Sequence, residues 1–263
     1  MIAPEKYGPW AMVLGASEGI GEAFVRQIAA AGVNVVLVSR RQSVLDALAA
    51  SLPDTVQHRT LAVDLTADDA VDQLIAATDD IEVGLVVYNA GADTMAVKFH
   101  DRSLDEVMHL VKLNVVTPTK LCHQIGAQMR ARKRGGIILL GSMAGLAGTG
   151  WVATYSATKA YDQMLAEGLW RELKADGVDV MVLVAGATAT PAHDRMGAKV
   201  TKEYPPMDPA DVAREGLAAL GSGPLHVAGD ANRANFARMS PAPRVDIINQ
   251  MTHGTHLLFD VTD

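Results

Sequence analysis

Tyr155 and Lys159 are the residues of this sequence whose types and spacing most clearly suggest chemistry. They lie four residues apart in a stretch with helical spacing, so their side chains are expected on one face, one turn apart. A tyrosine hydroxyl in water has a pKa of about 10, and a neighbouring ammonium group favours the phenolate. Such a pair can serve as a general acid or base. Ser142 follows a short apolar run, where its hydroxyl can hold a substrate oxygen while charge develops on it.

A glycine-rich turn between the first apolar run and the first helical stretch predicts a phosphate-binding site. Glycines at such a turn let backbone N–H groups approach a pyrophosphate at a helix N-terminus. The spacing is Gly-x3-Gly-x-Gly, which differs from the common Gly-x-Gly-x-x-Gly pattern of dinucleotide-binding proteins. The residues expected beside the cofactor in this turn are Gly15, Ser17, Glu18, Gly19, Ile20 and Gly21.

The end of the second apolar run indicates which dinucleotide is bound. An NAD-binding protein usually has a carboxylate here for the ribose 2′-hydroxyl, whereas this chain has Ser39-Arg40-Arg41 and no carboxylate before Asp46. A small residue followed by two arginines suits the 2′-phosphate of NADP. Glu18 opposes this interpretation, because its carboxylate weakens NADP preference if it points at the phosphate. NADP is therefore the predicted cofactor, and NAD remains the alternative.

Strand-length apolar runs and helical stretches alternate along the chain, which predicts an α/β fold: a doubly wound parallel sheet with helices on both faces. The predicted strands are Ala11–Leu14, Val33–Val38, Leu61–Val63, Val83–Tyr88, Ile137–Leu140, Val178–Val184 and Leu225–Ala228. The predicted helices are Gly21–Ala31, Ser43–Leu52, Ala67–Thr78, Leu104–Arg132, Tyr155–Asp176 and Pro209–Leu220. Gly32 and Gly177 are expected to end helices, and Asp208 is expected to cap one.

Five motifs in order give the chain a resemblance to the short-chain dehydrogenase/reductase family. They are Gly15-x3-Gly19-x-Gly21, Asn89-Ala90-Gly91, Asn114, Ser142 and Tyr155-Ser156-Ala157-Thr158-Lys159. The resemblance extends to Gly229 and implies a single Rossmann-type NAD(P)-binding domain over residues 1–263. A lid loop is predicted at about 188–207 and a C-terminal tail at about 230–263. The chain departs from the family pattern at Leu14, where Thr is common, and at Ala185, where Pro is common.

The resemblance implies further roles for individual residues. Asn114, Ser142, Tyr155 and Lys159 form the catalytic tetrad, in which Asn114 positions a water that links Lys159 to solvent. Lys159 also hydrogen-bonds the nicotinamide ribose, and Asp64 contacts the adenine amino group. The cofactor-binding residues expected outside the glycine turn are Ser39, Arg40, Arg41, Asp64, Leu65, Asn89, Ala90, Gly91, Tyr155, Lys159, Gly186, Thr188 and Thr190.

The expected reaction is hydride transfer to or from a ketone or secondary alcohol, with carbonyl reduction favoured because cytosolic NADP is mostly reduced. Lipophilic, steroid-like ketones and 3-oxoacyl thioesters are the predicted substrates. Met143 and Trp151 are expected to wall an apolar pocket, with packing beneath the loop an equal alternative, and His193 is expected to contact substrate from the lid. Two other functions stay open: an NAD-dependent alcohol dehydrogenase, and a catalytically silent NADP-sensing or scaffold protein.

Composition excludes several other classes. The chain has 23 Lys and Arg against 30 Asp and Glu, a net charge of −7, and 5% aromatic residues, which argues against nucleic-acid binding. A single cysteine, Cys122, excludes an internal disulfide or a cysteine-cluster zinc site, and no metal is expected, although His253 and His256 are spaced to share one. The uncharged segment 135–158 is too rich in glycine to predict a membrane span. A cytoplasmic homodimer or homotetramer is expected.

Overall fold

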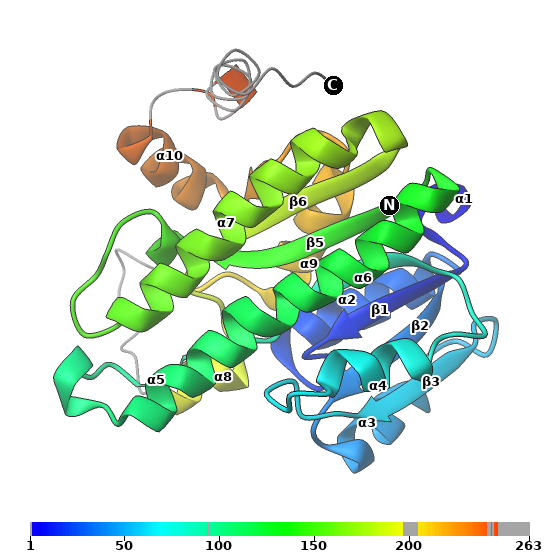
Figure 1. Ribbon diagram of the computed structural model, residues 1–263, viewed down its shortest axis with the longest axis horizontal. Coiled ribbons are helices and arrows are strands. Elements are labelled where there is room, and N and C mark those ends of the chain that lie inside the picture. Colours follow the sequence, from blue (N-terminus) through cyan, green and yellow to red (C-terminus); the bar gives the residue numbers. More distant parts are fainter. Residues whose placement is uncertain (1, 94, 197–204, 241–242, 244, 247–263) are drawn as a thin grey trace.

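The computed structural model describes residues 2–93, 95–196, 205–240, 243 and 245–246 (Figure 1). Within them the chain forms a seven-stranded, fully parallel sheet in the order β3-β2-β1-β4-β5-β6-β7. Its strands are β1 (Trp10–Leu14), β2 (Asn34–Ser39), β3 (His58–Ala62), β4 (Val83–Tyr88), β5 (Gly135–Ser142), β6 (Val178–Ala185) and β7 (Leu225–Val227). Each overlaps a predicted apolar run, although β3 begins three residues before the run predicted at Leu61–Val63 and shares only Leu61 and Ala62 with it. The predicted fold class is confirmed. The order reverses between β1 and β4, which is where open α/β sheets bind ligands.

Continuous apolar runs form these strands because both faces of the sheet are covered. All five residues of β1 are buried. Ala11 and Val13 pack into one layer, whereas Met12 and Leu14 pack into the other. A purely alternating pattern would have left one face for water, and this sequence does not provide one.

Helices cover the two faces as the alternation predicts (Figure 1). One layer is made by α2 (Gly19–Ala30), α3 (Gln42–Ala49) and α9 (Pro209–Ala219), through side chains such as Phe24, Leu45 and Val212. The other is made by α4 (Ala70–Ala76), α6 (Thr117–Arg132) and α7 (Ala153–Leu173). The predicted helix ends are confirmed: Gly32 and Gly177 have positive φ of 81° and 73°, and Asp208 Oδ1 accepts a hydrogen bond from the Ala210 N–H at 2.7 Å.

The helix predicted over Leu104–Arg132 is not one regular helix. It consists of α5 (Leu104–Val111), a π-helical turn over Lys112–Val116, and α6. Pro118 is the physical reason, because it has no N–H to donate to the carbonyl of Asn114 four residues earlier and its ring would clash there. The chain widens by one residue before the proline, which places Asn114 in the wide turn.

Three helices were missed by the sequence prediction: α1 (Pro4–Tyr7), α8 (Pro191–Arg195) and α10 (Asp230–Met239). The short α8 lies in the segment predicted to be irregular, and it begins where Thr190 Oγ1 accepts a hydrogen bond from the His193 N–H at 3.2 Å. Both ends of the predicted lid are joined by a parallel bridge between Thr188 and Met207. Residues 197–204 of the lid and most of the tail beyond residue 240 lie outside the described residues, so lid closure stays a prediction.

Candidate active site

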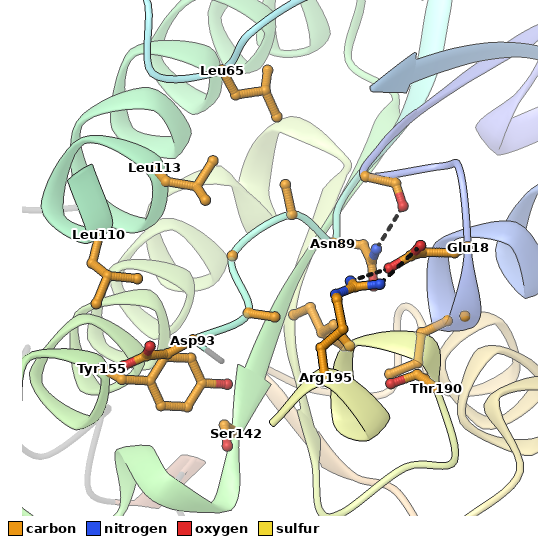
Figure 2. A pocket seen from close by; sticks show the side chains of 18 of the residues that line it. Glu18, Leu65, Asn89, Asp93, Leu110, Leu113, Ser142, Tyr155, Thr190 and Arg195 are labelled. Carbon is orange, nitrogen blue, oxygen red and sulfur yellow. Dashed lines mark hydrogen bonds and ion pairs between the residues drawn. The ribbon is translucent and has the colours of Figure 1, made fainter. Parts of the chain in front are cut away.

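A cavity of about 1140 Å³ opens at the carboxyl edge of the sheet, around the point where the strand order reverses (Figure 2). The glycine turn after β1, the ends of β2, β4, β5 and β6, and the helices α5, α7 and α8 all contribute residues to its wall. A volume of this size exceeds that of most drug-sized ligand sites, which suits a dinucleotide with a substrate beside it.

The glycine turn has the close approach that a bound pyrophosphate needs. Gly15 and Gly19 have positive φ of 79° and 59°, which residues with a side chain rarely adopt. A Cβ at Gly21 would lie 2.0 Å from the Gly15 carbonyl oxygen, so only glycine fits there. Asn89 Nδ2 donates to the same carbonyl at 3.0 Å and fixes the turn against the end of β4. The turn leads directly into α2, whose first N–H groups can receive a phosphate.

Glu18 occupies the centre of a cationic cluster at this end of the cavity. Arg41 donates to Glu18 at 2.7 Å and to Ser17 Oγ at 3.1 Å. Arg195 of α8 forms a second ion pair with Glu18, as Figure 2 shows. Hydrogen bonds from Arg195, and then from Arg41, lower the pKa of Glu18 against the opposing effect of burial. Arg40 also lines the cavity, where its charge acts on Asp64, so this end has three guanidinium groups and two carboxylates and is net positive.

The side predicted to hold the adenine has a polar corner and an apolar wall. Asp64 Oδ1 accepts hydrogen bonds from the backbone N–H and the hydroxyl of Thr66, at 3.0 and 2.8 Å. These bonds lower the pKa of Asp64 with help from the charge of Arg40, although burial opposes them. Leu65, Leu110 and Leu113 complete the wall (Figure 2). This corner can therefore hold a flat base with an amino group.

The residues predicted to be catalytic meet at the other end of the cavity. Ser142 is the last residue of β5, and Tyr155 and Lys159 lie one turn apart on α7. Figure 2 shows Tyr155 and Ser142 in the same part of the cavity, as the sequence predicted. The Lys159 ammonium lies 5.9 Å from the centre of the Tyr155 ring, and its side chain is 3% exposed.

Asn114 lies behind this group and does not line the cavity formed by the described residues. It is fully buried in the π-helical turn, and its Nδ2 donates to Thr158 Oγ1 at 2.9 Å and to the Gly91 carbonyl at 3.3 Å. Its Oδ1 is buried without a hydrogen-bond partner among the described residues. A buried acceptor of this kind fits an ordered water, which is the role that the sequence resemblance predicts for it.

Comparison with known proteins identifies the family. Residues 9–201 match the family described as short chain dehydrogenase. The chain belongs to the short-chain dehydrogenase family. It is therefore an oxidoreductase that acts on CH–OH or C=O groups, as the sequence predicted.

Individual relatives agree with this assignment. The chain is 34% identical over 250 residues to a 7beta-hydroxysteroid dehydrogenase of Clostridium sardiniense. The aligned region covers 94% of this chain and 95% of the relative. It is 37% identical over 191 residues to a very-long-chain 3-oxoacyl-CoA reductase of Neurospora crassa. Here the aligned region covers 70% of this chain and 58% of the relative. Its structure matches a short-chain dehydrogenase from Sphingobium yanoikuyae in complex with NADPH, with a TM-score of 0.80 and 27% identity over 97% of each chain.

Most residues predicted for the dehydrogenase site line one continuous cavity. The predicted residues in its wall are Gly15, Ser17, Glu18, Gly19, Ile20, Ser39, Arg40, Arg41, Asp64, Leu65, Asn89, Ala90, Gly91, Ser142, Tyr155, Lys159, Gly186, Thr188, Thr190 and His193. Gly21 packs beneath the glycine turn instead of facing the cavity. A Cβ on Gly19 would lie 2.8 Å from Thr190 Cγ2, so Thr190 is close to the predicted phosphate position.

Met143 and Trp151 are not part of the wall that the described residues form. Met143 packs against the hydrophobic core beneath the loop, which is the alternative the sequence left open. Trp151 is 58% exposed, and its carbonyl accepts a hydrogen bond from the Val97 N–H at 2.8 Å. The structure therefore gives no support to a substrate contact by either residue.

Three features of the site were missed by sequence reasoning: the partner of Lys159, the ion pair of Arg195, and a buried ion pair between Asp93 and Arg102. The two bonds between Arg102 and Asp93 are each 2.9 Å long, and the side chains are 5% and 6% exposed. This pair fixes the loop after Asn89-Ala90-Gly91 at the edge of the cavity. Only the i, i+3 spacing of Lys159 and Asp162 could have been found in the sequence. Glu18 and Arg195 are 177 positions apart, and the nine positions between Asp93 and Arg102 match no helical spacing.

Neither a metal site nor a membrane span is found in the described part of the chain. No group of three or more histidine, cysteine and acidic residues gathers there in a metal-binding arrangement. No described helix is long and apolar enough to cross a bilayer. His253 and His256, the pair considered from sequence, lie outside the described residues.

Proposed function

We propose that the protein is an NADP-dependent dehydrogenase/reductase that interconverts a ketone and a secondary alcohol. The observation that carries the proposal is the meeting of Ser142, Tyr155 and Lys159 at the end of the cavity opposite the glycine turn. NADP(H) would supply or accept the hydride when bound. Ser142 would hold the substrate oxygen, Tyr155 would exchange its proton, and the Lys159 ammonium would favour the phenolate during that exchange. Asn114 would hold the water that returns the proton to solvent.

NADP is favoured over NAD by Ser39, Arg40 and Arg41 at the end of β2. The structural relative in complex with NADPH supports this choice. Glu18 is the reason to keep NAD as the second candidate, because it engages Arg41 and so competes with a 2′-phosphate for that guanidinium group. The net positive charge of the cluster favours the phosphate.

Steroid-like ketones or alcohols are the first substrate class, because the relative from Clostridium sardiniense acts on a hydroxysteroid and matches nearly the whole chain. A 3-oxoacyl thioester is the second, supported by the reductase from Neurospora crassa. The exposed side chains of Met95 and Met196 at the cavity wall suit a bulky apolar molecule of either class.

A homodimer in the cytoplasm is the proposed state, with a tetramer left open. Apolar side chains are exposed along α5, the π-helical turn and α7: Leu104, Met108, Val116 and Met164 are between 39% and 72% exposed. A second copy of the chain would bury such a face. Light scattering would refute association by giving 27.8 kDa, the mass of one chain, at micromolar concentration. A reducing cytoplasm suits Cys122, because it is a free cysteine.

Absorbance at 340 nm during reaction with a panel of ketones and alcohols tests the proposed function. Oxidation of NADPH by a steroid ketone, or reduction of NADP by the corresponding alcohol, is the expected result. A protein that binds NADPH but turns over no member of either substrate class would favour the silent sensing or scaffold function. A preference for NADH would favour the NAD-dependent alternative.

A further inference from the structure

Lys159 has a buried acidic partner that the proposed reaction does not use. Its ammonium donates to the Leu140 carbonyl at 2.7 Å and to Asp162 Oδ2 at 3.0 Å. Lys159 and Asp162 side chains are each 3% exposed. Two of the three N–H donors of the ammonium are thereby directed to β5 and α7, and the third remains for the cavity that Lys159 also lines.

Besides each other, few titratable groups act on Lys159 and Asp162. Tyr155, one turn earlier on α7, acts on Lys159. The titratable groups that face Asp162 are Lys159 on its own helix, Tyr88 on β4 and Cys122 on α6. The Tyr88 hydroxyl donates to the Leu113 carbonyl at 2.5 Å, and Cys122 is a buried thiol, so neither neutralises the carboxylate. Asp162 Oδ1 has no hydrogen-bond partner among the described residues. Lys159 is therefore the one cation in the described part of the chain that compensates the Asp162 charge.

We propose that Asp162 is a positioning residue that acts through Lys159. It keeps the buried ammonium protonated and holds it beneath Tyr155, so that the proton-exchanging hydroxyl always has a positive charge beside it. The inference rests on the proposed catalytic roles of Tyr155 and Lys159. It assigns to Asp162 a function in the reaction, although Asp162 itself does not line the cavity.

The burial of the pair argues for this role over a purely structural one. A buried ion pair is seldom more stabilising than apolar side chains of the same volume, so stability alone does not explain an aspartate here. Burial acts to lower the pKa of Lys159, but the charge of Asp162, the charge of Tyr155 and the hydrogen bond to Asp162 together raise that pKa. Without the carboxylate, only the charge of Tyr155 would oppose the effect of burial, and Lys159 would lose its proton at a lower pH.

The variant Asp162→Asn tests the proposal, because it keeps the side-chain shape and an oxygen acceptor for Lys159 but removes the charge. Glu167→Gln is the matched control: it removes a buried carboxylate from the same helix, about 12 Å further along the helix axis than Lys159. Each protein would be labelled with 13C at lysine Cε, and the lysine signals would be followed by NMR as the pH is raised. The Lys159 signal would be identified by its absence in Lys159→Met. Alcohol oxidation would be measured over the same pH range.

In the unmodified protein and in Glu167→Gln, Lys159 should stay charged to at least pH 10, and oxidation should reach a plateau at alkaline pH. In Asp162→Asn, Lys159 should titrate about one pH unit or more lower, and the oxidation rate should fall as pH rises through that value. Asp162→Glu should restore part of the plateau.

An unchanged Lys159 titration in Asp162→Asn would overturn the proposal, whether or not a substrate is known. A lowered titration with an unaltered rate profile would also overturn it, since Lys159 charge would then not matter to the reaction. Failure of the proposed function alone would appear differently. The unmodified protein would show no turnover, but Lys159 would still titrate at a lower pH in Asp162→Asn.

Discussion

The two ends of the cavity hold ion pairs of the same chemical kind in different surroundings. At the catalytic end, the Lys159 and Asp162 side chains are each 3% exposed. At the phosphate end, Arg41 and Arg195 are each 53% exposed and Glu18 is 23% exposed. Water and salt screen the second set strongly and the first hardly at all.

This difference in exposure distinguishes a charge that keeps its partner from charges whose partners can be replaced by a ligand. A buried pair can be broken only at a large free-energy cost, so it suits a residue that must remain charged through every turnover. Exposed pairs contribute little to stability and can be exchanged for contacts with a phosphate. We therefore expect substitutions at the catalytic end to alter chemistry and folding, and those at the phosphate end to alter cofactor affinity.

Lys159→Met should show the largest effect. It leaves the Asp162 carboxylate buried without a cation, which should lower the free energy of unfolding by about 3–5 kcal/mol and abolish turnover. Urea denaturation would measure the first effect. The double variant Lys159→Met with Asp162→Leu should recover most of the stability but none of the activity. If the single variant is as stable as the unmodified protein, the pair is not a buried ion pair in solution.

Arg40→Ala should weaken NADPH binding about tenfold or more, because one charge-assisted contact with the 2′-phosphate contributes about 1.5–3 kcal/mol. NADH lacks this phosphate, so its affinity should barely change. Quenching of protein fluorescence by each nucleotide would give the two dissociation constants. Equal weakening of both nucleotides would place Arg40 elsewhere than at the 2′-phosphate.

Glu18→Gln should have a smaller effect of the opposite sign. Freed from the carboxylate, Arg41 and Arg195 should bind NADPH up to about fivefold more tightly, and the gain should shrink as salt is added. The lowered pKa of Glu18 means that its own charge persists at neutral pH and is lost only as the pH falls through that lowered value. Weaker NADPH binding by this variant would show that Glu18 supports the cofactor instead of competing with it.

The rate of cleavage by trypsin should show the smallest effect of these predictions. Arg195 is exposed and held only by Glu18 in the described structure, so cleavage there should be slowed when NADP and substrate cover α8. The predicted lid also contains Lys199 and Lys202, which lie outside the described residues. Equal cleavage rates with and without ligand would favour a permanently ordered loop over a lid that closes.

The fold and the motif residues could be predicted because they depend on local pattern. Continuous apolar runs gave all seven described strands, and the glycine turn and the Tyr155–Lys159 spacing gave both ends of the cavity. The π-helical turn was missed because apolar periodicity does not resolve one extra residue, although Pro118 was a usable signal. Arg195 was missed as a partner of Glu18 because the two residues are 177 positions apart, and only the folded chain brings them together.

Turnover and NADPH affinity of Tyr155→Phe, measured side by side, test the central claim most directly. The substitution removes only the hydroxyl, so turnover should fall to background at 340 nm while the NADPH dissociation constant stays within about twofold of the unmodified value, because the ring and the phosphate end are intact. Retention of more than a few per cent of the activity would show that another group exchanges the proton. It would contradict the assignment of this end of the cavity as the catalytic one.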